Sequence, residues 1–135
     1  MSETNVDLIL AGRDAYNAGH FDAFIELCAP DIEAFPDATV FPESSPIHGR
    51  DEYRRFLEEI NSAWISARQD TIEAFALGGD RVVHRGEWGG KGAASGIETV
   101  SSITSIWTIR DGQIARVEYF FDHDQALKAV GLEDG

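Results

Sequence analysis

Residues 97–121 read IETVSSITSIWTIRDGQIARVEYFF, and this stretch predicts a β-hairpin. Ile97–Ile109 and Gln113–Phe121 are two runs rich in the apolar, β-branched and aromatic residues that favour strands, although both faces of the first run are half polar. Asp111-Gly112 separates the two runs, and this dipeptide is typical of tight hairpin turns, which need positive φ angles. The stretch therefore predicts two long antiparallel strands near the C-terminus.

Two further strands are predicted immediately upstream. Thr71–Leu77 and Arg81–Gly89 show the side-chain period of two that is typical of strands and flank Gly78-Gly79-Asp80, which predicts a turn. Residues 89–96 are rich in glycine and small residues, so we expect a loose connection or a bulge there.

Four segments have helical periodicity. They are Thr4–Ala18, Asp22–Cys28, Gly49–Trp64 and, after a cap at Asp122, His123–Val130. Between the second and third of these, residues 31–46 are interrupted by prolines, so only short extended pieces at 32–35 and 39–41 are expected, and no central strand. Helices segregated from a run of antiparallel strands predict the α+β class, with helices against the concave face of a curved sheet.

Length and charge limit the possible functions. The 135 residues predict one domain, residues 1–135, with 43% hydrophobic and 26% charged residues. A formal charge of −13 disfavours nucleic acid and anionic membranes, which both attract basic surfaces. Because Cys28 is the single cysteine and no secretion signal or membrane-spanning run is present, we expect a cytoplasmic protein without disulfides.

Three segments resemble the SnoaL-like branch of the nuclear-transport-factor-2-like superfamily. They are PIHGRDEYRRFL (46–57), SGIETVSSITSIWTIRDGQIARVEYFFD (95–122) and QALKAVGL (125–132). The resemblance implies a cone-shaped α+β barrel of the cystatin-like type, with a curved antiparallel sheet around the N-terminal helices and a deep apolar pocket. It also implies no metal or organic cofactor, and a homodimer formed through the outer face of the sheet.

The resemblance leaves the activity open, because this scaffold carries isomerases, aldol cyclases, epoxide hydrolases, dehydratases and binding domains. Two hypotheses follow. The chain is either a cofactor-free enzyme that uses acid/base chemistry on a small hydrophobic, oxygen-bearing molecule, or a non-catalytic domain that binds such a molecule or dimerises.

Arg85 and Glu87 are candidate catalytic residues, because alternation puts both on one face of a strand. The pair resembles the Arg-x-Asp of the limonene-epoxide-hydrolase branch, in which arginine and two aspartates polarise an epoxide and activate water. Tyr119 occupies the position of the second aspartate, so that constellation is incomplete here. His84 lies on the opposite face, and either His84 or the Arg85–Glu87 pair points into the pocket.

Other residues are candidates for proton transfer or ligand contact. Asp31, Glu33, His48 and His84 are alternative bases to Glu87, of which His48 at the start of the third helix is favoured, and Tyr16 and Tyr119 are candidate donors to an oxyanion. The predicted ligand-binding residues are mainly aromatic: Tyr16, Phe24, Phe35, Phe56, Trp64 and Phe121. No metal-binding, phosphate-binding or nucleophile-elbow motif is present, which agrees with the absence of a cofactor.

Overall fold

The computed structural model describes residues 2–37, 46–62, 64–77, 80–92 and 94–131, with side chains described from Thr4 onward except at 64–67. The elements in chain order are α1 (Ser2–Asn17), α2 (Phe21–Glu26), β1 (Cys28–Phe35), β2 (Ile47–His48), α3 (Arg50–Ser62), β3 (Trp64–Ala76), β4 (Arg81–Gly92), β5 (Glu98–Arg110), β6 (Gln113–Phe120) and α4 (His123–Ala129). The predicted α+β class is confirmed.

The six strands form one curved, open sheet in the order β2-β1-β6-β5-β4-β3. Neighbouring strands are antiparallel, as predicted, except that β1 runs parallel to β6, with Ala34 opposite Val117. The expectation that residues 31–46 hold no central strand is wrong for residues 31–35, which lie in β1 between β2 and β6. Pro30 is tolerated because it falls in the irregular part of the β1–β6 pairing, between Cys28 and Glu33. The expected piece at 39–41 lies outside the described residues.

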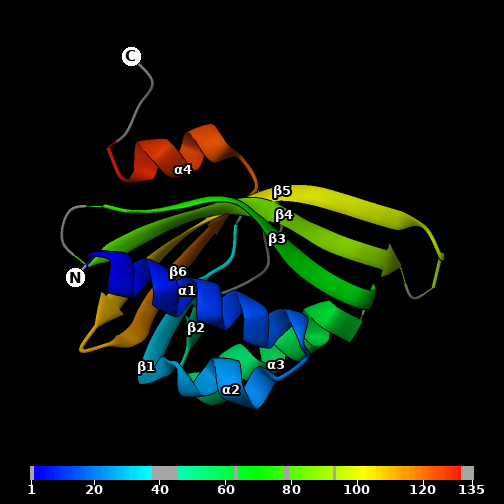
Figure 1. The fold of residues 1–135 in the computed structure, drawn as a ribbon. Helices are drawn as coiled ribbons and strands as arrows, with labels where there is room; N and C mark the ends of the chain where they lie inside the picture. Colours follow the sequence, from blue (N-terminus) through cyan, green and yellow to red (C-terminus); the bar gives the residue numbers. More distant parts are fainter. Residues whose placement is uncertain (1, 38–45, 63, 78–79, 93, 132–135) are drawn as a thin grey trace.

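Helices α1, α2 and α3 lie together on one side of the sheet, and α4 lies on the other (Figure 1). The side chain of Asn17 ties α1 to edge strand β3 by two hydrogen bonds to the backbone of Gln69, at 2.8 and 2.7 Å. The main core lies on the side of α1 to α3, where Trp107 packs with Ile9, Phe24 and Tyr53. A smaller cluster of Val83, Ile106 and Ala126 forms beneath α4.

Strands β3 and β4 are longer than the sequence predicts. The glycine-rich segment expected to be a loose connection continues β4 as far as Gly92. A Cβ atom on Gly89 would lie only 1.9 Å from the carbonyl oxygen of Thr99, so glycine is needed there for close strand approach. Glycine in this segment therefore permits a strand instead of ending it.

Helix α4 begins as predicted. The side chain of Asp122 accepts hydrogen bonds from the backbone N–H groups of Asp124 and Gln125. No helix in the described part of the chain is long and apolar enough to cross a membrane.

Candidate functional site

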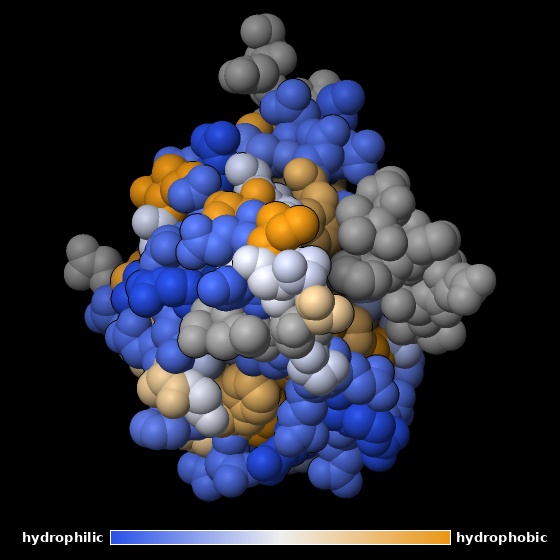
Figure 2. All heavy atoms as spheres, turned by 90° about the vertical axis from the view of Figure 1, so that its right-hand side faces the viewer, coloured by the Kyte–Doolittle hydropathy of each residue, from blue (hydrophilic) through white to orange (hydrophobic). Residues whose placement is uncertain are grey.

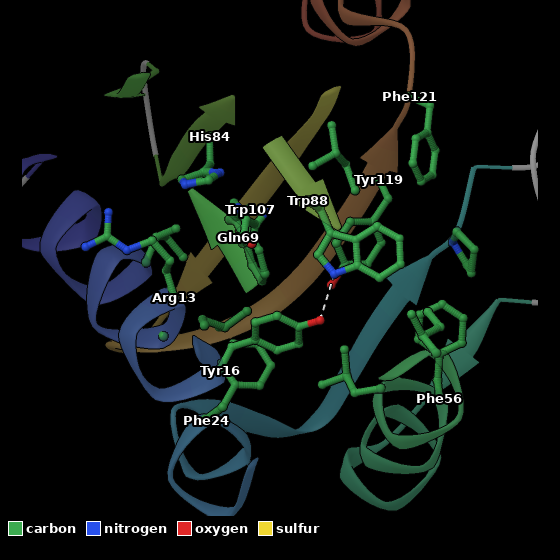
Figure 3. A pocket seen from close by; sticks show the side chains of 17 residues that line it. Arg13, Tyr16, Phe24, Phe56, Gln69, His84, Trp88, Trp107, Tyr119 and Phe121 are labelled. Atoms are coloured by element: carbon green, nitrogen blue, oxygen red, sulfur yellow. Dashed lines mark hydrogen bonds between the residues drawn. The ribbon is translucent and has the colours of Figure 1, made fainter. Parts of the chain in front are cut away.

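A pocket with a free volume of about 80 Å³ lies between the helices and the concave face of the sheet. Figure 3 shows its wall, in which Trp88 and Trp107 from the sheet face Tyr16 and Phe24 from the helices. The complete lining is Ile9, Gly12, Arg13, Tyr16, Phe24, Pro36, Phe56, Leu57, Ile60, Gln69, His84, Trp88, Ile103, Trp107, Ile114, Tyr119 and Phe121. Most of these side chains are apolar or aromatic, and none of the described lining residues is an aspartate or a glutamate.

The alternation of β4 decides which candidate residues face the pocket. His84 and Trp88 line the pocket, so Arg85 and Glu87 point to the opposite face of the sheet. Val83 lies on this opposite face and packs beneath helix α4. Glu87 is exposed to solvent. Arg85 is half-buried, and its Nε atom is buried without a hydrogen-bond partner in the described part of the chain.

His84 is the buried titratable group at one end of the pocket. It is 1% exposed, and its Nε2 atom lies 2.8 Å from the hydroxyl oxygen of Thr71. The same Thr71 oxygen accepts a hydrogen bond of 2.7 Å from Nη1 of Arg13. Burial, and secondly the charge of Arg13, lower the pKa of His84 to about 4, so the imidazole is neutral at pH 7.

Tyr16 lies in the middle of the pocket wall and already has two hydrogen-bond partners. Its hydroxyl donates to Oδ1 of Asn61 at 2.5 Å and accepts from Nε1 of Trp88 at 2.7 Å (Figure 3). Burial raises the pKa of Tyr16, and these two hydrogen bonds partly oppose the rise. Because its single proton is used, Tyr16 is a structural link between α1, α3 and β4 more than a free donor.

Two tyrosine hydroxyls meet at another part of the pocket wall. The hydroxyl of Tyr119 is hydrogen-bonded to that of Tyr53, which comes from α3 and is fully buried. Burial raises the pKa of both tyrosines, so both stay protonated at neutral pH. If Tyr53 donates, the proton of Tyr119 is available to an oxygen atom in the pocket.

A family model for the SnoaL-like domain matches residues 10–117. The chain belongs to the SnoaL-like domain family. No functionally curated protein matches the sequence.

Solved structures share this SnoaL-like fold. A candidate polyketide cyclase of Xanthomonas campestris is 22% identical, with a TM-score of 0.78 over 96% of this chain and 98% of that one. TerC, co-crystallised with polyporic acid, is 22% identical, with a TM-score of 0.76 over 93% and 96%. A Catenulispora acidiphila protein with a ketosteroid isomerase-like fold, in complex with trimethylamine, is 16% identical, with a TM-score of 0.74 over 93% and 92%. At these identities, the likeness shows the fold and leaves the chemistry to the residues of this chain.

The pocket lining includes six of the candidate residues from the sequence analysis. These are Tyr16, Phe24, Phe56, His84, Tyr119 and Phe121. The other predicted residues lie elsewhere, or outside the described side chains as for Trp64.

His48 and Phe35 are two of the predicted residues that lie away from the pocket. The side chain of His48 is 63% exposed, and its Nδ1 atom lies 3.3 Å from a carboxylate oxygen of Glu33. Phe35 lies under the guanidinium of Arg116, 4.3 Å from the ring centre to Cζ. Both residues belong to the edge of the sheet formed by β1 and β2.

Sequence reasoning missed Arg13, Gln69 and the polar partners Thr71 and Asn61. Arg13 could have been found, because Ile9, Gly12, Arg13 and Tyr16 recur at spacings of three and four and so share one side of α1. Thr71 could not, because its contact with His84 depends on the register of β3 against β4. No cluster of side chains suited to a metal ion occurs among the described residues.

Proposed function

We propose that this SnoaL-like protein binds a small hydrophobic molecule with a carbonyl group and catalyses proton transfer at the neighbouring carbon, without a cofactor. This is the chemistry of isomerases and cyclases. The observation that carries the proposal is the pocket itself, in which an apolar wall holds a neutral histidine and a protonated tyrosine pair.

Tyr119 is the proposed donor to the ligand oxygen. Charge grows on that oxygen when a neighbouring C–H bond loses its proton, and a preorganised donor in an apolar site stabilises that charge. Tyr53 supports this role if it is the donor in its hydrogen bond with Tyr119, because that bond then aligns the Tyr119 hydroxyl and further spreads the charge.

His84 is the proposed proton acceptor. Among the titratable groups of the described lining, His84 has a basic lone pair at pH 7, because its imidazole is neutral. Tyr16 and Tyr119 are protonated and Arg13 is a cation, so these three cannot accept a proton. Glu87, the base favoured by the sequence pattern, lies on the other face of β4 and cannot reach a ligand in the pocket.

Hydrogen–deuterium exchange at the α-carbon of 2-tetralone tests the proposal, because this small aromatic ketone needs only a base and an oxygen donor. Purified protein in D₂O should accelerate the exchange over buffer, the rate should saturate with 2-tetralone, and 2-naphthol should compete. His84→Gln is the matched variant and should lose the acceleration. Saturable exchange that survives in His84→Gln would rule out His84 as the base.

Binding without chemistry is the second candidate function. It is favoured by the contacts of His84 and Tyr16, whose polar atoms already have protein partners. Thermal shift against neutral ketones, lactones and epoxides separates the two functions, since a ligand at 100 times its dissociation constant adds about 2.7 kcal/mol of stability. Stabilisation without exchange or turnover would favour the binding protein.

We also propose that a second copy of the chain covers the outer face of the sheet. Near the β4–β5 end, Ile97 and Val100 are 65% and 63% exposed. Figure 2, which views the end of the molecule where β3, β4 and β5 project, shows several apolar side chains on the surface. Arg85 and the exposed Glu73 and Glu87 share the outer face, so two copies can pair opposite charges across a twofold axis. Val100→Asp should convert a dimer to a monomer in light scattering, and a wild-type monomer would refute the proposal.

A further inference from the structure

We infer that Thr71 and Arg13 are positioning residues that hold the proton of neutral His84 on Nδ1 and leave the lone pair on Nε2. The inference rests on the proposed function, because it concerns the histidine assigned there as the base. It adds Thr71, which lies outside the pocket lining, and Arg13, which lies in the lining and is bonded to Thr71, and it specifies the tautomer of the imidazole before a ligand binds.

The hydrogen bonds of the Thr71 hydroxyl determine which ring nitrogen of His84 carries the proton. The Thr71 hydroxyl has one proton and two lone pairs. One lone pair accepts from Nη1 of Arg13, which is always a donor, at 2.7 Å. The other partner of the hydroxyl among the described residues is Nε2 of His84 at 2.8 Å. The Thr71 proton finds an acceptor only if Nε2 carries the lone pair, and leaving it without an acceptor in this partly buried place would cost free energy.

Thr71 lies behind His84, outside the lining of the pocket. Thr71 is not part of the lining, whereas His84 is, so the hydroxyl holds the imidazole from outside the lining. The pairing of β3 and β4 has a bulge between Thr71 and Glu73, with Thr71 opposite Gly86. The bulge inserts one extra residue into β3, and without it the side chains beyond Thr71 would face the other side of the sheet.

Gly86 gives the imidazole the room to take this position. A Cβ atom there would lie 3.1 Å from Cε1 of His84 and 2.3 Å from the carbonyl oxygen of Asp70. The ring therefore extends along β4 over Gly86, towards the residue opposite, which is Thr71. Arg13 of α1, Thr71 of β3 and Gly86 of β4 thus all favour the same orientation of the His84 ring.

The charges around His84 favour the neutral state. From α1, Arg13 and Tyr16 face the pocket, Tyr119 faces it from β6, and no carboxylate lines the described pocket. The carboxylate that pairs with Arg13 is that of Asp14, 2.8 Å from Nη2, and its side chain is 69% exposed, so solvent weakens its effect on the ring. Arg13 both orients Thr71 and opposes a second positive charge on His84.

The functional consequence concerns the path of the proton. The lone pair of Nε2 points at the Thr71 oxygen, so the hydrogen bond between Thr71 and His84 must open before Nε2 can take a proton from a ligand in the pocket. When the bond closes again, the hydroxyl turns its hydrogen away and accepts from the new Nε2–H group, while Arg13 keeps its bond to the same oxygen.

Nitrogen-15 NMR of the full chain tests the inference directly, because the two ring nitrogens give different signals in each tautomer. His84→Gln assigns the His84 signals. Wild type should show one tautomer with its proton on Nδ1. Thr71→Val should give averaged signals, and Thr71→Ser should restore the wild-type pattern. Wild-type signals in Thr71→Val, or a proton on Nε2 in wild type, would overturn the inference.

Arg13→Met supplies the second arm. Removing the cation should move the titration midpoint of His84 upward from about 4, whereas Arg68→Met, which removes an exposed arginine paired with Asp70, should leave it unchanged. Equal midpoints in Arg13→Met and wild type would overturn the role of Arg13. Failure of the proposed function is a separate outcome, since it appears as 2-tetralone exchange that does not exceed buffer while these NMR signals remain as expected.

Discussion

The two faces of β4 differ more than their sequence suggests. Residues 84 to 88 alternate between a pocket face, with His84 and Trp88, and an outer face, with Arg85 and Glu87. The outer face has the residues that a sequence pattern associates with acid/base catalysis, but it is packed beneath α4 or open to solvent. The pocket face has His84 and Trp88, which line the pocket, and its titratable residue is a neutral histidine.

The contrast shows that a catalytic pattern has meaning only together with strand orientation. If the register of a strand shifts by one residue, the side chains of its two faces change places, since the side-chain period of a strand is two. The charged side chains of Arg85 and Glu87 cost less on the outer face, because burying them in the apolar pocket would remove their hydration. Each of the following predictions changes a residue of the inner or the outer face and measures what that face does.

Among the four changes considered first, Tyr119→Phe should have the largest effect. Losing one preorganised donor to the developing oxyanion typically slows the chemical step by about 10²–10³-fold. The variant keeps the apolar contacts of the ring, so the fold and ligand binding should persist. The measurement is the saturated rate of 2-tetralone exchange, with Val83→Ala as the outer-face control that lowers stability but leaves the rate unchanged. A Tyr119→Phe rate equal to wild type would exclude the proposed role.

Acidification should destabilise the protein through His84. The folded protein holds its pKa near 4 and the unfolded chain near 6.5, so between these values the unfolded state binds more protons and stability falls as the pH falls. The difference corresponds to about 3 kcal/mol, fully lost only below pH 4. Urea unfolding from pH 7 to pH 4 measures it, and His84→Gln should reduce the slope. An identical slope in the variant would show that His84 titrates normally.

Trp88→Phe should have a smaller effect on the pocket face. It removes the indole N–H that donates to Tyr16 and leaves the Tyr16 oxygen with one partner fewer. We expect a loss of about 1 kcal/mol in the free energy of unfolding, the usual value of one such hydrogen bond. Chemical denaturation gives the value, and unchanged stability would indicate that water replaces the indole.

Asp122→Ala belongs to the outer face and should have the smallest effect on the exchange rate. The carboxylate caps α4, and the loss of a helix cap costs about 0.5–2 kcal/mol. Stability should fall within that range, while 2-tetralone exchange stays at the wild-type rate because α4 lies across the sheet from the pocket. A slower exchange rate in this variant would mean that the two faces are coupled.

Most of the fold could be predicted from the sequence, because alternation and helical spacing are local signals. Asp111-Gly112 fixed the β5–β6 hairpin, and the stripe that includes Tyr53 and Leu57 fixed α3. The parallel pairing of β1 with β6 could not be predicted, because it joins segments about 80 residues apart without a local turn.

The site was predictable only in part. Aromatic residues such as Phe24 and Phe121 were found because large apolar side chains on inner faces border any cavity of this fold. The polar groups depend on tertiary contacts. The orientation of β4, the bulge beside Thr71 and the hydrogen bond between Tyr53 and Tyr119 all follow from packing between distant elements.

The most direct test of the account compares His84→Gln with Glu87→Gln in the same 2-tetralone exchange assay. The two variants lie three residues apart on opposite faces of one strand and each replaces a titratable side chain with an amide. The account predicts that Glu87→Gln keeps the wild-type rate and that His84→Gln loses about 10²–10⁴-fold, as expected for a missing general base. A slow Glu87→Gln beside a fully active His84→Gln would contradict it.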